Sequence, residues 1–151
     1  MTLTDDDLMG ESRYNDSLAS VCDELERKDL AVASDGALCV FLPGFTGRDG
    51  RPVPLIIRTS DGGYGYATTD LATIKYRVRE LHADRIVYVI GAPQHLHLQM
   101  VFQTARLAGW LPEGVVGRGK WFWPTLREAE AAALRRAMPI GLAWCSRGCG
   151  W

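Results

Sequence analysis

Apolar and polar positions along the first 60 residues predict one helix followed by short antiparallel strands. Apolar side chains recur at helical spacing over residues 17–28, where they share one face: Leu18, Val21, Cys22 and Leu25. Two short apolar runs, residues 30–33 and 37–42, flank Ser34-Asp35-Gly36. Because Asp-Gly tolerates the positive φ of a tight turn, these runs predict a hairpin. A third strand is expected over residues 53–57, between turns at 48–51 and 61–63.

The next 50 residues predict a helix, a buried strand and a second helix. Thr68 or Thr69 is expected to cap the first helix, with Asp70 in its first turn, where a negative charge suits the helix dipole. Its apolar stripe is expected to be Leu71, Ile74, Val78 and Leu81, with Lys75, Arg77 and Arg79 facing away. Residues 85–90 form a nearly continuous apolar run, typical of a parallel strand covered on both faces.

The second helix is expected over residues 95–107, with Gly109 as its C-terminal stop. Helix, buried strand and helix in this order indicate an open α/β sheet. Ligands of such sheets bind beyond the carboxyl ends of the strands, and residues 91–94 follow the predicted strand at such a place.

Composition narrows the classes of protein that fit. The net charge is -1, with acids and bases interspersed, which argues against a strongly basic nucleic-acid-binding surface. No apolar run approaches the roughly 20 residues that span a bilayer, and the acidic start does not resemble a secretory signal. We therefore expect a cytoplasmic protein that does not enter a membrane.

The four cysteines do not predict a metal site. Cys22 and Cys39 lie in predicted core elements and are interpreted as buried thiols in a reducing compartment. Cys145 and Cys149 could bind a metal, but no second ligand pair lies near them, and a closed zinc site needs four ligands. His95 and His97 lack an acidic or thiol partner in the sequence, so no metal is expected there either.

Two stretches carry a family resemblance: residues 60–70, SDGGYGYATTD, and residues 83–110, ADRIVYVIGAPQHLHLQMVFQTARLAGW. In order, spacing and residue type they resemble the class I arginyl-tRNA synthetases. The resemblance implies that residues 1–116 are part of the catalytic domain, namely the C-terminal half of its Rossmann-like α/β fold with an added β-hairpin. Residues 117–151 would be an atypical, divergent or out-of-frame tail containing a helix over 125–138.

The resemblance also implies an activity and a set of site residues. The family activates arginine with ATP and Mg²⁺ and transfers it to the arginine tRNA. Tyr66 and Asp70 match the pair that grips the arginine side chain, Glu11 resembles a further carboxylate aimed at the guanidinium, and Gln94 matches a residue that binds the α-amino end. Gly91 and His97 lie where the family approaches the nucleotide.

The chemistry of these residue types agrees with arginine recognition. A carboxylate accepts two guanidinium N–H bonds side by side, and an amide such as Gln94 offers both a donor and an acceptor to a zwitterion. Each of these residues, taken by itself, could also have a purely structural role. Asp70 could be a first-turn helix acid, Tyr66 a strand aromatic, Glu11 a solvated loop acid, and Gln94 a helix cap.

Neither ATP signature of the class I synthetases occurs in the sequence. There is no His-x-Gly-His motif and no Lys-Met-Ser-Lys-like loop, and the family's tRNA-binding domains have no counterpart either. Two hypotheses follow. In the first, the chain is a truncated catalytic domain of an arginine–tRNA ligase, inactive by itself. In the second, it is a stand-alone paralogue that binds arginine or another guanidino ligand without ligating tRNA.

Overall fold

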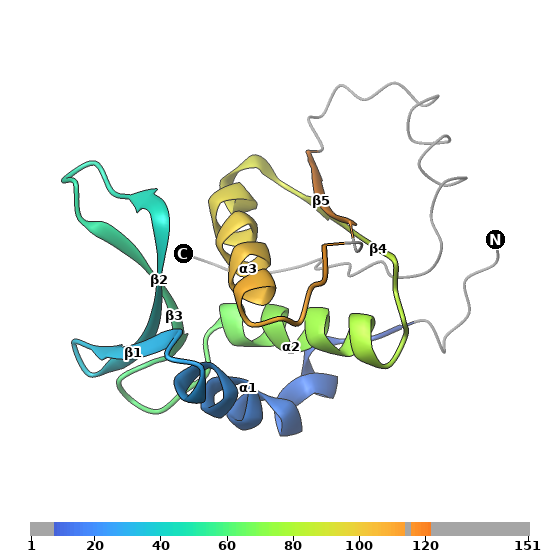
Figure 1. Cartoon of the computed structure of the whole chain (residues 1–151), viewed down its shortest axis with the longest axis horizontal. Helices are drawn as coiled ribbons and strands as arrows, with labels where there is room; N and C mark the ends of the chain where they lie inside the picture. The colour runs from blue at the N-terminus through green and yellow to red at the C-terminus, as the bar shows by residue number, and fades with distance from the viewer. Residues whose placement is uncertain (1–7, 114–115, 122–151) are drawn as a thin grey trace.

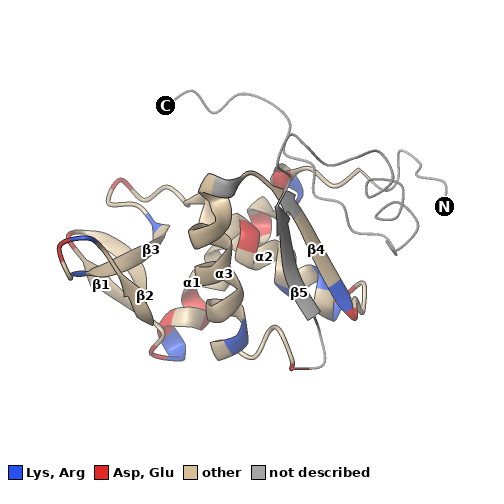
Figure 2. Ribbon diagram, turned by 90° about the horizontal axis from the view of Figure 1, so that it is seen from above, with Lys and Arg blue, Asp and Glu red and all other residues tan. Residues whose placement is uncertain are grey.

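The structure is a computed structural model that describes residues 8–113 and 116–121. Two small sheets lie at opposite ends of the described part, and three helices fill the space between them (Figure 1). One sheet has three antiparallel strands in the order β1-β2-β3, and the other is the parallel pair β4-β5. The view from above shows the same order of sheet, helices and sheet (Figure 2). The predicted mixture of α and β elements is thus confirmed.

The predicted hairpin is present. Strand β1, Ala31–Ser34, pairs antiparallel with β2, Ala37–Thr46, and the turn between them has positive φ at Asp35 and Gly36, at 50° and 79°. Strand β3, Pro52–Arg58, pairs with the other edge of β2. β2 runs four residues beyond its predicted end at 42, because Thr46 still pairs with Pro52 beyond a register shift.

Helix α1, Asn15–Arg27, carries the predicted apolar face. A short 3-10 helix, η2 (Glu11–Tyr14), precedes it, so the helical segment begins earlier than predicted. The buried ring of Tyr14 packs edge-on against Tyr76, with 5.7 Å between ring centroids. This contact ties η2 to helix α2 (Tyr66–Arg79). It explains why the residues that precede the apolar repeat are already helical. Cys22 and Cys39 are buried thiols as predicted, and burial raises the pKa of both.

Helix α2, Tyr66–Arg79, begins before the predicted caps. Gly65 occupies the N-cap position, where a Cβ atom would lie 2.9 Å from the Ile56 carbonyl oxygen, so only glycine fits against β3. The Thr68 hydroxyl is turned inward and donates to the Ile57 carbonyl. The prediction that Thr68 or Thr69 caps the helix is therefore wrong. So is the placement of Asp70 in the first turn, because Asp70 is the fifth helical residue.

The predicted faces of α2 are only partly right. Leu71 and Ile74 are buried as expected, whereas Leu81 lies beyond the helix end and is exposed. Arg77 was expected to face solvent but is 5% exposed. Its guanidinium carbon lies 5.4 Å from the ring centroid of Tyr88 in β4, a cation–π contact. The prediction failed because α2 packs against α1, α3 and β3 as well as against this strand, so more than one stripe is covered.

The strand–helix–strand unit follows. Strand β4, Arg85–Ile90, is followed by the 3-10 helix η3 (Ala92–Gln94) and helix α3 (His95–Leu107). Strand β5, Val116–Trp121, lies parallel to β4 in the register Arg85↔Val116 to Ile90↔Trp121. Gly109 follows α3 with φ 72°, which confirms the predicted stop. Among the β4 side chains that the structure describes, Ile86 and Tyr88 on one face are buried, while Val87 on the other face is half-buried.

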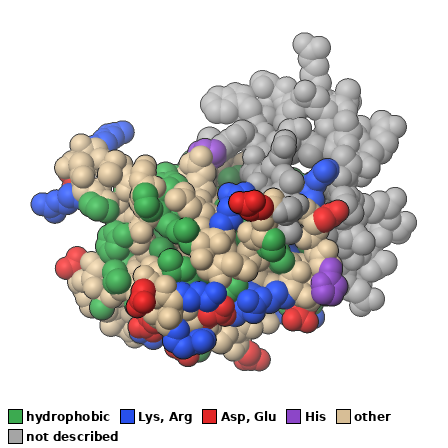
Figure 3. All heavy atoms as spheres, viewed as in Figure 1, with side chains coloured by type: hydrophobic (Ala, Val, Ile, Leu, Met, Phe, Trp, Pro, Cys, Tyr) green, Lys and Arg blue, Asp and Glu red, His purple; other side chains and the backbone are tan. Residues whose placement is uncertain are grey.

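A polar cluster centred on Glu24 holds the helices together. The Glu24 carboxylate accepts hydrogen bonds from Lys75 Nζ at 2.6 Å and from Trp110 Nε1 at 2.7 Å, and Lys28 Nζ lies 3.4 Å away. Lys28 also donates to the Ala108 carbonyl at 2.6 Å. Helix α1, helix α2 and the segment after α3 therefore meet at one carboxylate. Figure 3 shows acidic and basic side chains interspersed over the face formed by α1 and α2.

Replacing Thr68 with valine tests the tie between α2 and β3. Valine keeps the shape of the side chain but leaves the buried Ile57 carbonyl without this donor. We expect a loss of about 1–2 kcal/mol in the free energy of unfolding, measured by urea titration followed by circular dichroism. Thr69→Val, one residue later and only half-buried, is the control and should change stability by less than about 0.5 kcal/mol. An equal loss of unfolding free energy in both variants would contradict a stabilising hydrogen bond from Thr68 to Ile57.

Candidate functional site

The predicted site residues come from four places in the fold. Tyr66 and Asp70 lie on α2, Gly91 directly follows β4, and Gln94 ends η3. His97 lies in the first turn of α3, and Glu11 begins η2. Because α3 follows β4 through a three-residue 3-10 helix, its first turn lies near the carboxyl end of the strand. This is the place at which we expected a ligand.

Asp70 and His97 are in direct contact. The Nε2 atom of His97 lies 2.7 Å from Oδ2 of Asp70, so the pair links α2 to α3 across 27 residues of sequence. Their side chains are 29% and 34% exposed, which leaves the pair accessible to a ligand. The contact with His97 engages one oxygen of the Asp70 carboxylate, Oδ2. Its second oxygen can therefore accept from outside.

Tyr66 is the first residue of α2 and lies one turn before Asp70. Residues four apart share one side of a helix, so the two side chains belong to the same surface. Tyr66 is 65% exposed, unusual for a tyrosine side chain. The alternative of a strand aromatic is wrong, because the residue is helical, and so is the alternative of Asp70 as a first-turn acid.

Gln94 occupies the N-cap position of α3 but does not cap the helix through its side chain. Its backbone N–H donates to the Gly91 carbonyl at 3.1 Å. The alternative interpretation of Gln94 as a side-chain cap is therefore wrong. Its side chain is exposed, as is Gly91, beside the end of β4.

Glu11 is exposed at the start of η2. This element meets α2 through Tyr76, which also receives a 3.4 Å hydrogen bond from Arg13. Tyr76 lies six residues after Asp70, about 9 Å along the helix axis at 1.5 Å per residue. Glu11 thus begins an element that contacts α2 at Tyr76, less than two helical turns beyond Asp70.

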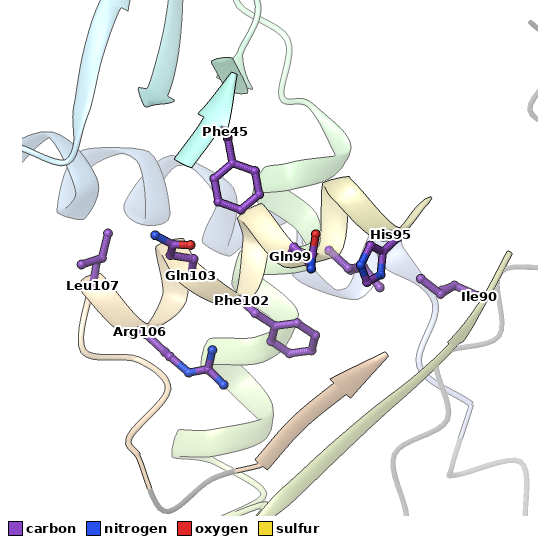
Figure 4. A pocket seen from close by; sticks show the side chains of 9 residues that line it. Phe45, Ile90, His95, Gln99, Phe102, Gln103, Arg106 and Leu107 are labelled. Atoms are coloured by element: carbon purple, nitrogen blue, oxygen red, sulfur yellow. The ribbon is translucent and has the colours of Figure 1, made fainter. Parts of the chain in front are cut away.

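A groove of about 560 Å³ runs along the other side of α3. Figure 4 shows Phe45 of β2 and Ile90 of β4 on its walls, with His95, Gln99 and Arg106 directed from α3. None of the six predicted site residues lines it. His95 and His97 thus serve different sides of α3: one lines the groove, and the other contacts α2. The groove and the Asp70 region are separate features.

The sequence interpretation missed Arg77 and Tyr88, which lie close to Asp70. Burial raises the pKa of the Tyr88 phenol, the nearby Arg77 opposes this, and the Asp70 carboxylate adds to the increase. Arg77 Nη1 and the Tyr88 hydroxyl are both buried without a hydrogen-bond partner among the described residues. The spacing contained a signal, because Tyr66, Asp70, Thr73 and Arg77 are four, three and four residues apart and so form one polar stripe on a helix.

Comparison with known proteins identifies the family. The model of the class I tRNA synthetase (R) catalytic domain matches residues 1–123. An arginine–tRNA ligase of Thermobifida fusca is 77% identical over 111 residues, which cover 74% of this chain and 19% of the relative. One of Streptomyces avermitilis is 55% identical over 115 residues, covering 76% of this chain and 20% of the relative.

A solved structure shows the same relationship. The arginyl-tRNA synthetase of Plasmodium falciparum superposes with a TM-score of 0.67 at 28% identity, covering 85% of this chain and 22% of that one. This chain therefore spans about a fifth of the length of the proteins it matches. The matched region contains β4, α3 and β5 together with the residues predicted for arginine recognition. The chain belongs to the arginyl-tRNA synthetases of class I and corresponds to a part of their catalytic domain.

Proposed function

We propose that this chain supplies the arginine-binding part of a Rossmann-like synthetase catalytic domain. The β4–α3–β5 unit supports this proposal, because parallel strands joined by a helix are the repeating unit of such sheets. Only two parallel strands lie in the described part, whereas parallel sheets are normally larger and covered on both faces. The remaining strands would come from the part of the domain that is not among these residues.

The observation that carries the proposal is the accessible Asp70 carboxylate on α2, which contacts the first turn of α3 near the carboxyl end of β4. One of its oxygens is held by His97, and the exposed ring of Tyr66 stands one turn away on the same helix. A guanidinium is planar and permanently charged, so it pairs side-on with a carboxylate and packs its flat face on an aromatic ring. Asp70 and Tyr66 offer these two complementary surfaces.

The other site residues have supporting roles in this proposal. Gln94 follows β4 and would orient the α-amino end of arginine through its exposed amide. Glu11, at the exposed start of η2, would add a second carboxylate for the guanidinium. Gly91 and His97 would face the nucleotide, as the family resemblance implies.

ATP and the arginine tRNA enter the proposal as substrates of the full-length enzymes. The family joins arginine to tRNA with ATP, but neither ATP signature occurs in this sequence. Among the described residues, no group of three or more Asp, Glu, His or Cys side chains is arranged to hold a metal ion. Likewise, no described helix is long and apolar enough to cross a membrane.

Calorimetric titration with arginine tests the proposal. We expect the chain to bind arginine with a Kd on the order of 1 mM, about 4 kcal/mol, because it holds one wall of the pocket. Asp70→Asn removes the charge and keeps the size of the side chain, so it should weaken binding at least about tenfold. Asp84→Asn serves as the control, since Asp84 is an exposed carboxylate in the connection before β4. Wild-type protein that is folded but gives no heat with arginine would refute the proposed function.

A further inference from the structure

His97 contacts the carboxylate on which the proposed arginine site depends. The Nε2–Oδ2 distance of 2.7 Å is that of a strong hydrogen bond to a charged acceptor. The two residues come from different helices, so the bond fixes the Asp70 side chain relative to α3 as well as within α2. A carboxylate on a helix surface without such a partner would rotate among several rotamers.

The groups around the pair explain why Asp70 needs a partner from α3. On α2, Arg77 shares a side of the helix with Asp70, but it lies two helical turns away and is directed at the ring of Tyr88. From β4, Tyr88 is a buried phenol whose raised pKa keeps it neutral. His95, two residues before His97 on α3, lines the groove. His97 provides the contact that reaches Asp70 from α3.

The bond also leaves the acceptor capacity that a guanidinium needs. An ionised carboxylate has about four acceptor positions, and the single bond from Nε2 uses one of them. A neutral imidazole that donates through Nε2 orients the carboxylate without neutralising it. Side-on pairing with a planar ligand is demanding in geometry, so an oriented carboxylate binds more tightly than a freely rotating one.

We propose that His97 is a positioning residue for arginine recognition, in which its Nε2–H holds the Asp70 carboxylate in the orientation that receives the guanidinium. This rests on the proposed function, because it assumes that Asp70 binds arginine. It differs from the nucleotide contact implied by the family resemblance, since it acts on the arginine site and needs no ATP.

Three substitutions at His97 separate positioning from a merely structural role. The side-chain amide nitrogen of glutamine can take the place of Nε2, whereas that of asparagine corresponds to Nδ1 and falls short of Asp70. In calorimetry with arginine and without ATP, we expect His97→Ala and His97→Asn to weaken binding by about tenfold. His97→Gln should stay within about threefold of the wild type, and Gln99→Ala, an exposed α3 position on the groove side, should match the wild type. Thermal unfolding of each variant verifies that it is folded.

Each outcome has a separate meaning. Rescue by glutamine but not by asparagine supports positioning through Nε2, because a packing role would follow size instead of donor position. Wild-type affinity in a folded His97→Ala variant overturns the role of His97 and leaves the arginine site intact. Equal loss in all three His97 variants also overturns it. If wild-type protein does not bind arginine, the proposed function fails, and the role of His97 fails with it.

Discussion

Replacing Glu24 with glutamine is expected to lower the free energy of unfolding by about 2–4 kcal/mol. The carboxylate receives Lys75 and Trp110 at hydrogen-bond distance, and its side chain is only 14% exposed. Removing one partner of a largely buried ion pair leaves the other charge unpaired, which is among the costlier single changes. Lys75 would lose its carboxylate while remaining 5.1 Å from the centroid of the Trp110 ring.

The lowered pKa of Glu24 predicts how the free energy of unfolding depends on pH. Partial burial acts to raise the pKa of Glu24, but the hydrogen bonds from Lys75 and Trp110 and the charge of Lys75 outweigh it and lower the pKa from 4.5 to about 2. A carboxyl with a lowered pKa stabilises the folded state above its unfolded pKa. Its contribution is therefore complete above about pH 5 and is lost as the pH falls from 4.5 towards 2.

Urea unfolding of wild-type and Glu24→Gln protein at pH 7 and pH 2.5 measures both effects. We expect a large difference in stability at pH 7 that shrinks at pH 2.5, because the carboxyl of the unfolded chain is then protonated while that of the folded protein is still mostly ionised. Glu80→Gln is the matched control, since Glu80 is an exposed carboxylate at the end of α2. If Glu24→Gln and Glu80→Gln cost the same at pH 7, Glu24 does not hold the helices together.

Elements whose local sequence pattern agrees with their packing were predictable from the sequence. The apolar repeat of α1, the Asp35-Gly36 turn, and the strand and helix bounds of β4 and α3 were confirmed. In each case, local sequence and tertiary packing favour the same structure, because alternation or helical spacing places the apolar side chains against the core.

Helix α2 was predicted less well because tertiary contacts override its local signals. Thr68 has the chemistry of an N-cap, but β3 offers its hydroxyl a carbonyl in the core. Arg77 looks like a surface residue until the ring of Tyr88 is placed beside it. Neither partner is a sequence neighbour, so a pattern read along the helix could not contain them.

The candidate site was predictable in its members but not in its contacts. The family resemblance selected Tyr66, Asp70, Gln94 and His97, whereas the Asp70–His97 bond depends on how α2 and α3 pack. Glu11 was selected in the same way, and the contact of its element with α2 through Tyr76 likewise depends on packing. Calorimetric titration with arginine measures whether these residues bind it.

A hybrid enzyme should reveal the largest functional effect of Asp70. The Thermobifida fusca ligase is 77% identical over 111 residues, so the matching segment of this chain can replace its own with little disturbance of packing. The hybrid regains the parts of the enzyme that this chain does not contain. In it, Asp70→Asn should reduce kcat/KM for arginine by about a thousandfold, roughly 4 kcal/mol, because the substrate cation loses its charged partner.

Aminoacylation of arginine tRNA by this hybrid tests the central claim most directly, namely that the chain is a functional arginine-binding part of a synthetase catalytic domain. We predict that the hybrid charges tRNA with arginine at a rate within about tenfold of the Thermobifida fusca enzyme, with Asp84→Asn unchanged and Asp70→Asn nearly inactive. A folded hybrid that fails to charge tRNA, or one in which Asp70→Asn keeps full activity, would contradict the account.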